Sequence, residues 1–348
     1  MKNNKFINLI IIIISLISCI FVFEFLLGIY YDKKYSSLSL DKLDEISKIA
    51  PYNHHIREFD LNRINKDQMY YNYYKTDFKN GKKIGLFGDS WMDYIAAKDL
   101  VYNKIKDNII ISEYINAGTT SFAPSLIEIQ FKDIISEKKI FFDLVVVYID
   151  QTDFMDEVCD YNKRRIVDDK GELLAVLKPT TFLNDRWSNT NDLAKSITGY
   201  NIFRLINSSL YRYYYKKTIS KNRCTWEEIS KFMYDKNLDD EFFKIFETNT
   251  LSLIKTLEKY SNNIIFLTHK HSKHFSGEYK NDVYNNLNQI VNNYRNTNLI
   301  EVIDLSEEIQ NAHFKEIFEP NDPASHPNKN YYVEISSKIS NIIYRILN

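Results

Sequence analysis

Two hydrophobicity patterns alternate along most of the chain: short apolar runs, and longer stretches in which apolar residues recur every three or four positions. The short runs predict buried strands and the longer stretches predict amphipathic helices. The predicted core strands cover residues 82–87, 109–112, 143–149, 264–268 and 299–303. The predicted helices cover about 90–106, 124–137, 240–260, 279–295 and 329–347. Strands and helices that alternate at these lengths predict an α/β fold, with a parallel sheet and helices on both of its faces.

The first 30 residues follow a different pattern. From Phe6 to Tyr30 the sequence is almost entirely apolar, and Glu24 is its only charged residue. About 20 apolar residues span the hydrocarbon core of a bilayer, whereas a cleavable signal peptide needs an apolar region of about 7–15. We therefore expect a retained transmembrane helix over 6–30, after a short stub over 1–5. Cys19 also fits a bacterial lipoprotein cleavage box, but apolar residues continue to Leu27, which favours the helix over lipidation.

The charges beside this run are nearly balanced, with Lys2 and Lys5 before it and Lys33 and Lys34 after it. The positive-inside rule therefore gives little help with orientation. A short stub followed by a long domain favours a single-pass membrane protein whose globular part lies outside the cytoplasm.

The remaining chain is predicted to divide into a stalk over 31–80 and one domain over 81–348. An insertion over about 156–239 lacks the rhythm of core strands. It opens with a predicted hairpin, whose strands at 164–167 and 172–177 flank Asp169-Lys170-Gly171. An insertion at the rim of a cleft is a natural place for substrate selection.

A serine stands directly after the first predicted core strand, in the sequence Gly88-Asp89-Ser90. A serine just past the carboxyl end of a buried strand is exposed on a tight turn, where its hydroxyl can act as a nucleophile. Near the end of the chain, Asp322 precedes His326 by four residues. A histidine can remove the serine proton, and an aspartate can orient the imidazole. Ser90, His326 and Asp322 are therefore the candidate catalytic residues.

In their order along the chain, these residues resemble the motifs of the SGNH/GDSL hydrolases. Gly88-Asp89-Ser90 matches the block that carries the nucleophile, Asn116-Ala117-Gly118 looks like the glycine block, and Asp322 to His326 looks like the last block. The resemblance covers roughly residues 82–348. It implies a flavodoxin-like parallel sheet and a serine esterase or acyltransferase. It also implies that Gly118 and Asn116 serve the oxyanion of the tetrahedral intermediate.

The chain departs from this family at two places. The third family block is usually Gly-x-Asn-Asp, but here the strand at 143–149 is followed by Asp150-Gln151-Thr152-Asp153. The asparagine amide is missing, and Thr152 offers a hydroxyl and Gln151 an amide in its place. Thr152 and Asp153 are the candidate substrate-binding residues of this block. The family also usually places its aspartate three residues before the histidine, a position that Pro323 occupies here.

Composition narrows the expected partners. The formal net charge is -1, and no basic stripe accompanies the 26 tyrosines and 22 phenylalanines, so nucleic acid is not an expected partner. Clusters such as Tyr211 to Tyr215 are predicted to be packing and surface aromatics, with carbohydrate stacking as the alternative. The expected partners are a carbohydrate or other ester substrate and, through the N-terminal helix, the membrane.

Cysteine and histidine positions bear on disulfides and metals. Cys159 and Cys224 both lie between the third and fourth predicted core strands, where one disulfide is expected and two separate buried thiols are the alternative. No Cys/His spacing predicts a zinc site, and no metal or cofactor is expected. His269 follows a strand end in a histidine cluster, but interleaved lysines favour a substrate-facing or loop-fixing role over metal binding.

The sequence thus predicts a membrane-anchored serine acyl hydrolase or O-acyltransferase. Its expected substrate is an O-acyl or acetyl group of a cell-envelope polysaccharide. The missing asparagine supports a competing class, a non-catalytic envelope protein of the same fold that binds glycan through a degenerate site.

Overall fold

The computed structural model describes most of the chain. The described residues are 2–34, 71–96, 99–119, 122–176, 240–271, 274, 277, 280, 282–294, 300–306, 326–328 and 331–348. The chain divides into two units, of which one comprises residues 1–50 and 179–222 and the other residues 51–178 and 223–348. The sheet and the candidate site belong to the second unit.

In the first unit the structure describes the helix α1 (Lys2–Lys34), which contains the whole apolar run from Phe6 to Tyr30. Large apolar side chains of α1 are exposed, among them Ile11, Phe21 and Phe25. Within the described part of the chain, no helix is long and apolar enough to cross a membrane. The predicted transmembrane anchor is therefore not confirmed.

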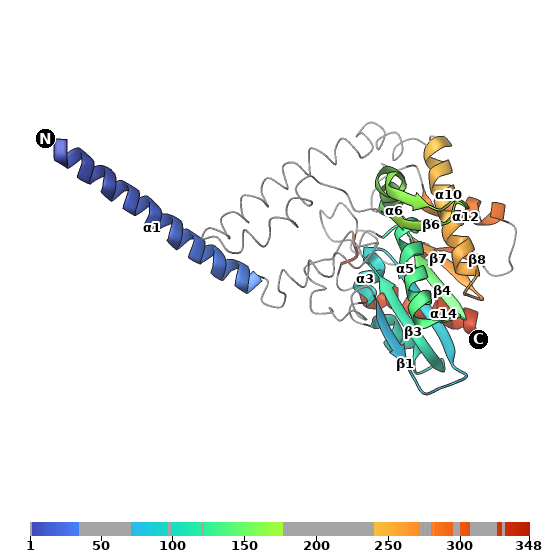
Figure 1. Ribbon diagram of the computed structural model, residues 1–348. Coiled ribbons are helices and arrows are strands. Elements are labelled where there is room, and N and C mark those ends of the chain that lie inside the picture. Colours follow the sequence, from blue (N-terminus) through green and yellow to red (C-terminus); the bar gives the residue numbers. More distant parts are fainter. Residues whose placement is uncertain are drawn as a thin grey trace. The chain divides into compact units, whose positions relative to one another are not determined.

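Among the described residues, the second unit is built on a six-stranded sheet with the order β1-β3-β2-β4-β7-β8 (Figure 1). Its strands are β1 (Asn72–Lys75), β2 (Lys82–Gly88), β3 (Ile111–Gly118), β4 (Leu144–Tyr148), β7 (Ile264–Thr268) and β8 (Ile300–Asp304). From β3 to β8 every neighbouring pair is parallel. Taken in chain order, these strands have the spatial order 2-1-3-4-5 of flavodoxin-like sheets. The predicted parallel α/β arrangement is confirmed for them.

The edge strand β1 differs from the prediction, because it pairs antiparallel with β3. The sheet is therefore mixed. Because β1 lies within 31–80, the segment predicted to be a stalk, the sheet also begins earlier in the chain than expected. Its aromatic residues explain why it is in the sheet. Tyr71, just before β1, is buried in the core, and Tyr73 packs against that core while its hydroxyl donates to Glu113 on β3 at 2.6 Å.

Helices cover both faces of the sheet, as predicted. They are α3 (Ser90–Ala96), α4 (Leu100–Ile105), α5 (Pro124–Lys138), α10 (Asp240–Glu258), α12 (Val283–Tyr294) and α14 (Tyr332–Leu347). On one face α5, α10 and α12 share a core with Phe87 and Val147, and on the other α3, α4 and α14 pack with Leu86 and Val146. Successive residues of β2 and of β4 therefore fill opposite cores.

Two elements differ clearly from their predicted bounds, beyond shifts of a few residues at the ends of others. The strand expected at 109–112 continues to Gly118, so Asn116 and Gly118 lie in β3. The helix expected at 90–106 is divided into α3 and α4, and Asp99 before α4 is left-handed, with φ 49°. No glycine or proline marks this break in the sequence, which is why the apolar pattern alone predicts one helix.

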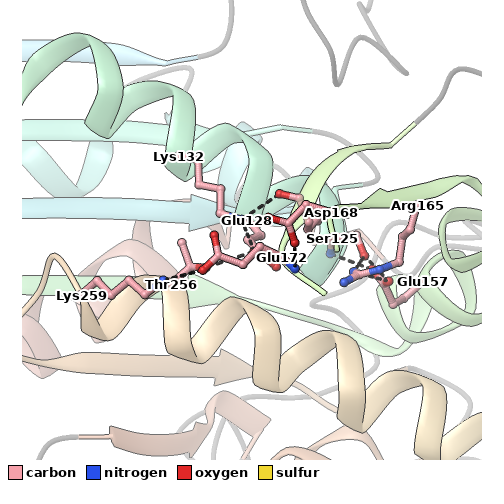
Figure 2. A network of polar contacts seen from close by, with 10 residues as sticks. Ser125, Glu128, Lys132, Glu157, Arg165, Asp168, Glu172, Thr256 and Lys259 are labelled. Atoms are coloured by element: carbon pink, nitrogen blue, oxygen red, sulfur yellow. Dashed lines mark hydrogen bonds and ion pairs between the residues drawn. The ribbon is translucent and has the colours of Figure 1, made fainter. Parts of the chain in front are cut away.

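The helix α6 (Gln151–Asp156) leads into the predicted insertion, which begins with a π-helical turn (Glu157–Tyr161). The hairpin of β5 (Arg165–Val167) and β6 (Leu173–Val176) follows, close to its predicted position. The buried carboxylate of Glu157 accepts hydrogen bonds from the N–H of Ser125 at 2.8 Å and from Asn249 Nδ2 at 2.6 Å. Figure 2 shows Arg165 of β5 reaching the same Ser125 and Glu157. This network fixes the start of the insertion to α5 and α10.

The rest of the predicted insertion, from 177 to 239, lies outside the described residues. Cys159, in the π-helical turn, is disulfide-bonded, and Cys19 is free. Cys224, the predicted partner of Cys159, also lies outside the described residues.

Candidate active site

Ser90 is positioned by the turn that joins β2 to α3. Gly88 has a φ of 147°, and a Cβ at this position would lie 2.6 Å from the Cβ of Tyr148 on β4, so the turn requires glycine. The Asp89 Oδ1 accepts a hydrogen bond from the N–H of Trp91 at 2.9 Å, within the first turn of α3. Ser90 thus lies at the carboxyl end of β2, where the strand order reverses and ligands bind in such sheets.

The structure brings His326 to Ser90 from the far end of the chain. His326 Nε2 lies 2.7 Å from Ser90 Oγ. Because a serine hydroxyl can donate to a neutral imidazole nitrogen, this pair has the geometry of a nucleophile and its general base. Ser90 is buried, with 7% of its surface exposed, whereas His326 is only partly buried. Asp322, predicted to orient His326, lies outside the described residues.

Gly118 and Asn116 lie on β3, beside the serine turn. A Cβ at Gly118 would be 2.4 Å from the backbone nitrogen of Asp93, so the glycine allows α3 to pack directly against β3. The backbone N–H of Gly118 was predicted to serve the oxyanion. It instead donates to Asn116 Oδ1 at 3.4 Å. Asn116 Nδ2 is buried and has no acceptor among the described residues. The side-chain amide of Asn116 is the stronger oxyanion candidate of the two.

The block after β4 forms a helix cap. Asp150 Oδ1 accepts from the N–H of Thr152 at 2.6 Å, from Thr152 Oγ1 at 2.6 Å and from the N–H of Asp153 at 3.2 Å. Asp153 Oδ2 accepts in return from the N–H of Asp150 at 2.9 Å, which completes a capping box at the start of α6. The Thr152 hydroxyl is therefore used within the cap.

Asp89, Asp150 and Asp153 form a buried cluster of carboxyl groups behind the serine turn. One oxygen of each lies within 4.8 Å of the others, and within the described part of the chain this is the group that could hold a metal ion. Burial, followed by the negative charge of Asp150, raises the pKa of Asp89 well above its ordinary value. Burial, with the charges of Asp89 and Asp150, raises the pKa of Asp153 as well. Asp89 and Asp153 thus retain protons at pH values where exposed aspartates are ionised.

A buried stack of rings lies beside the nucleophile. The His269 ring is 3.8 Å from the Trp91 ring, centroid to centroid, and Tyr148 OH lies 3.0 Å from His269 Nδ1. Burial lowers the pKa of His269 to about 3, so the ring is neutral at physiological pH. Of the two roles predicted for His269, loop fixing agrees with this packing, because Trp91 directly follows Ser90.

Comparison with known proteins gives only distant likenesses. No family model and no curated protein matches the chain. A solved structure of a catalytic mutant of Axe2, an acetylxylan esterase from Geobacillus stearothermophilus, is 12% identical, with a TM-score of 0.38, and the match covers 77% of this chain and 96% of that one. A second catalytic mutant of Axe2 gives 12%, a TM-score of 0.37, and 78% and 97% coverage. A likeness at this level assigns neither a family nor an activity to the chain.

Sequence reasoning predicted a loop-fixing role for His269 but missed its ring partners and the helix cap made by Asp150. Asp150 stands where the family block has its glycine, so the resemblance gave it no role of its own. It caps α6 because α6 begins at the next residue, Gln151. The stack of Trp91, Tyr148 and His269 joins α3, β4 and the residue after β7. One available signal was the aspartate that directly precedes the helix and follows a strand, because aspartate is a residue type that caps helices.

Proposed function

We propose that this protein is a serine acyl hydrolase or O-acyltransferase acting on ester groups of a carbohydrate. The observation that supports this most directly is the 2.7 Å contact between Ser90 Oγ and His326 Nε2. His326 takes the serine proton as Ser90 attacks the ester carbonyl, and it then protonates the leaving alcohol. Water releases the acyl group from Ser90 in hydrolysis, whereas a sugar hydroxyl accepts it in transfer.

The oxyanion needs hydrogen-bond donors that are not already used. The N–H of Ser90 lies in the first turn of α3, where backbone N–H groups have no partner within the helix. Asn116 Nδ2 is a second donor, because it is buried and has no acceptor among the described residues. We assign these two groups to the oxyanion in place of Gly118 and Thr152.

A fluorophosphonate probe tests the enzyme class directly, since it reacts covalently only with an activated serine. We expect labelling of the full chain at Ser90, no labelling of Ser90→Ala, and strong loss of labelling in His326→Ala. Thermal unfolding of each variant serves as the folding control. A folded parent protein that remains unlabelled would contradict the enzymatic proposal.

A second candidate function is glycan binding through a catalytically degenerate site. It is favoured by the engaged Thr152 hydroxyl and Gly118 amide, which leave the expected oxyanion donors occupied. Calorimetric binding of an acetylated oligosaccharide by the parent protein, without acyl release over long incubation, would favour this candidate.

We also propose that α1 attaches the protein to a membrane with the globular part outside the cytoplasm. The support is the exposed apolar surface of α1, which includes Ile11, Phe21 and Phe25. Carbonate extraction of membranes, followed by protease treatment of intact spheroplasts, tests this. Release by carbonate, or protection of the domain until lysis, would contradict the attachment or the orientation.

A further inference from the structure

A pocket lies far from Ser90 in the fold, between the ends of α5 and α10 and the hairpin of β5 and β6. We propose that this pocket binds an anionic segment of a polysaccharide and so holds a long substrate chain on the protein. The identification of the polymer as substrate rests on the proposed function, whereas the binding itself does not.

The pocket has the size of a ligand site. Its volume is about 620 Å³, within the range of about 300–1,000 Å³ that small-molecule sites usually occupy. Lys132 and Lys139 line it from α5 and the residue after that helix, and Lys259 lines it just past the end of α10. Glu172 lines it from the hairpin.

Two exposed aromatic residues give the pocket its apolar surface. Phe141 is 49% exposed and Tyr260 is 37% exposed, and both line the pocket. The neighbouring Phe142 is fully buried, so the exposure of Phe141 is not a general property of this loop. Flat, partly exposed rings with polar groups around them suit the apolar face of a sugar ring, and Tyr260 adds a hydroxyl.

The charge of the pocket favours an anionic ligand. Its lining contains three lysines and one glutamate, and one of these lysines, Lys132, is paired with the buried Glu128 behind the wall. The local balance is therefore +1, whereas the whole chain has a net charge of -1. Lys259 and Glu172 lie 3.3 Å apart, but both side chains are 56% exposed. An exposed pair of this kind contributes little stability, so a carboxylate or phosphate of a ligand can compete for Lys259.

The walls of the pocket are held in place before any ligand arrives. Lys132 Nζ lies 2.6 Å from the buried Glu128 and donates to the carbonyl oxygen of Leu173 at 2.8 Å, which joins α5 to the hairpin. Figure 2 shows Glu128, Lys132, Thr256, Glu172 and Lys259 converging on one region from α5, α10 and the hairpin. The N–H of Phe142 also donates to the carbonyl oxygen of Tyr260 at 2.7 Å. This hydrogen bond joins the two backbone segments that carry Phe141 and Tyr260. Fixed walls lower the entropy lost on binding.

The position of the pocket separates it from the reaction. Phe142 and Ser261 pair just before β4 and β7 begin, so the pocket lies near the amino ends of these strands. Ser90 lies at the carboxyl end of β2, which runs parallel to β4. A polymer held in the pocket therefore leaves Ser90 accessible, and tethering raises the effective concentration of its ester groups.

Affinity electrophoresis of the full chain in gels that contain polygalacturonate or dextran tests the proposal. We expect polygalacturonate, the anionic polymer, to retard the parent protein more strongly than neutral dextran does. The pair Phe141→Ala and Tyr260→Ala, and separately the pair Lys139→Gln and Lys259→Gln, should each weaken retardation by polygalacturonate about tenfold. The matched controls are Tyr344→Ala and Lys106→Gln, an exposed aromatic residue and an exposed lysine on the other face of the sheet, and both should behave like the parent.

Equal retardation by the two polymers, no retardation of the folded parent, or unchanged retardation of the pocket variants would each overturn the proposal. Ser90→Ala should bind polygalacturonate as the parent does. Binding that persists when Ser90 is inert to a fluorophosphonate would contradict the enzymatic proposal alone. Labelling of Ser90 without polymer binding would contradict the pocket alone.

Discussion

Two junctions between a strand and a helix lie side by side in this protein, and both are built on an aspartate cap. At the first, Asp89 caps α3 by accepting from the N–H of Trp91, and the hydroxyl of Ser90 contacts His326. At the second, Asp150 caps α6 and also accepts the hydroxyl of Thr152. Both junctions carry a hydroxyl side chain. The hydroxyl of Ser90 contacts the base His326, whereas the hydroxyl of Thr152 donates to the cap residue Asp150.

The backbone explains part of this difference. The first junction contains Gly88 at φ 147° and packs against Gly118, so the chain turns sharply and presents Ser90 at its apex. At the second, Asp150 has an ordinary extended conformation, with φ -113°, and Thr152 lies one residue further into its helix. A reactive hydroxyl thus requires both the tight turn and a cap that does not use its proton.

The largest expected effect comes from the pair at the first junction. Ser90→Ala and His326→Ala should each lower the rate of acyl release from an acetylated oligosaccharide by about 10⁴-fold or more. The double variant should lose little further, because the two residues act as a unit. Circular dichroism checks that each variant is folded. Losses that add in the double variant would contradict a shared catalytic role.

A substitution beneath the turn should sharpen the role of the backbone. In Gly118→Ala, the new methyl group would meet the backbone of Met92 and Asp93 at 2.4 Å, so α3 must shift. A small displacement of the nucleophile lowers kcat by about 10²-fold even when every catalytic group is present. Steady-state kinetics with a soluble ester measures this. The matched control is Gly171→Ala, because no atom lies within 4 Å of a Cβ there, although its φ of 79° strains any side chain. Equal kcat in Gly118→Ala and the parent would contradict the close-packing role.

The contrast between the junctions also shows what the sequence can predict. Apolar runs rich in β-branched residues, such as the one within 143–149, identify buried strands because such residues pack well on both faces of a parallel sheet. The order of the strands, together with the position of Ser90 after the first of them, then predicts the edge where the site forms. These inferences need only local patterns and general rules of topology.

Individual side-chain hydrogen bonds and the edge of the sheet were less predictable. The N–H of Gly118 is used by a side chain two residues earlier, and the Thr152 hydroxyl by Asp150, and neither bond leaves a signature in the residue pattern. The antiparallel strand β1 was missed because four residues rich in tyrosine are equally compatible with a stalk. The pairing of Ser90 with His326 was predicted from the resemblance of Gly88-Asp89-Ser90 and of the last block to family motifs. The distance between them along the chain gives no such indication.

The acidic cluster behind the two junctions predicts a pH effect on stability. The folded-state pKa of Asp153 is raised above its unfolded value, so its neutral form is favoured on folding. Stability from this group is fully present below the unfolded pKa, near 4, and it is lost as pH rises through the folded pKa. Asp153→Asn keeps an oxygen that can accept from the N–H of Asp150. It should therefore lose less unfolding free energy than the parent as the pH rises from about 4 through the folded-state pKa of Asp153.

Urea unfolding over this pH range measures the difference. The surface variant Asp77→Asn is the control, because Asp77 is exposed and should follow the parent. Parallel pH profiles for Asp153→Asn and the parent would show that Asp153 is not held neutral by the fold.

The smallest expected effect concerns the hydroxyl of the second junction. Thr152→Val keeps the shape of the side chain and removes only the hydroxyl, which donates to Asp150 at 2.6 Å. The lost hydrogen bond should lower the unfolding free energy by about 1 kcal/mol, and kcat should stay within about twofold of the parent because the hydroxyl is committed to the cap. Thr152→Ser, which restores the hydroxyl, should recover the stability. A fall in kcat on the order of 10²-fold would instead mean that the Thr152 hydroxyl leaves Asp150 and donates to the oxyanion during the reaction. In that case both junctions would act on the same substrate. The Ser90 hydroxyl would contact its base before the reaction, whereas the Thr152 hydroxyl would be released from its cap only during it.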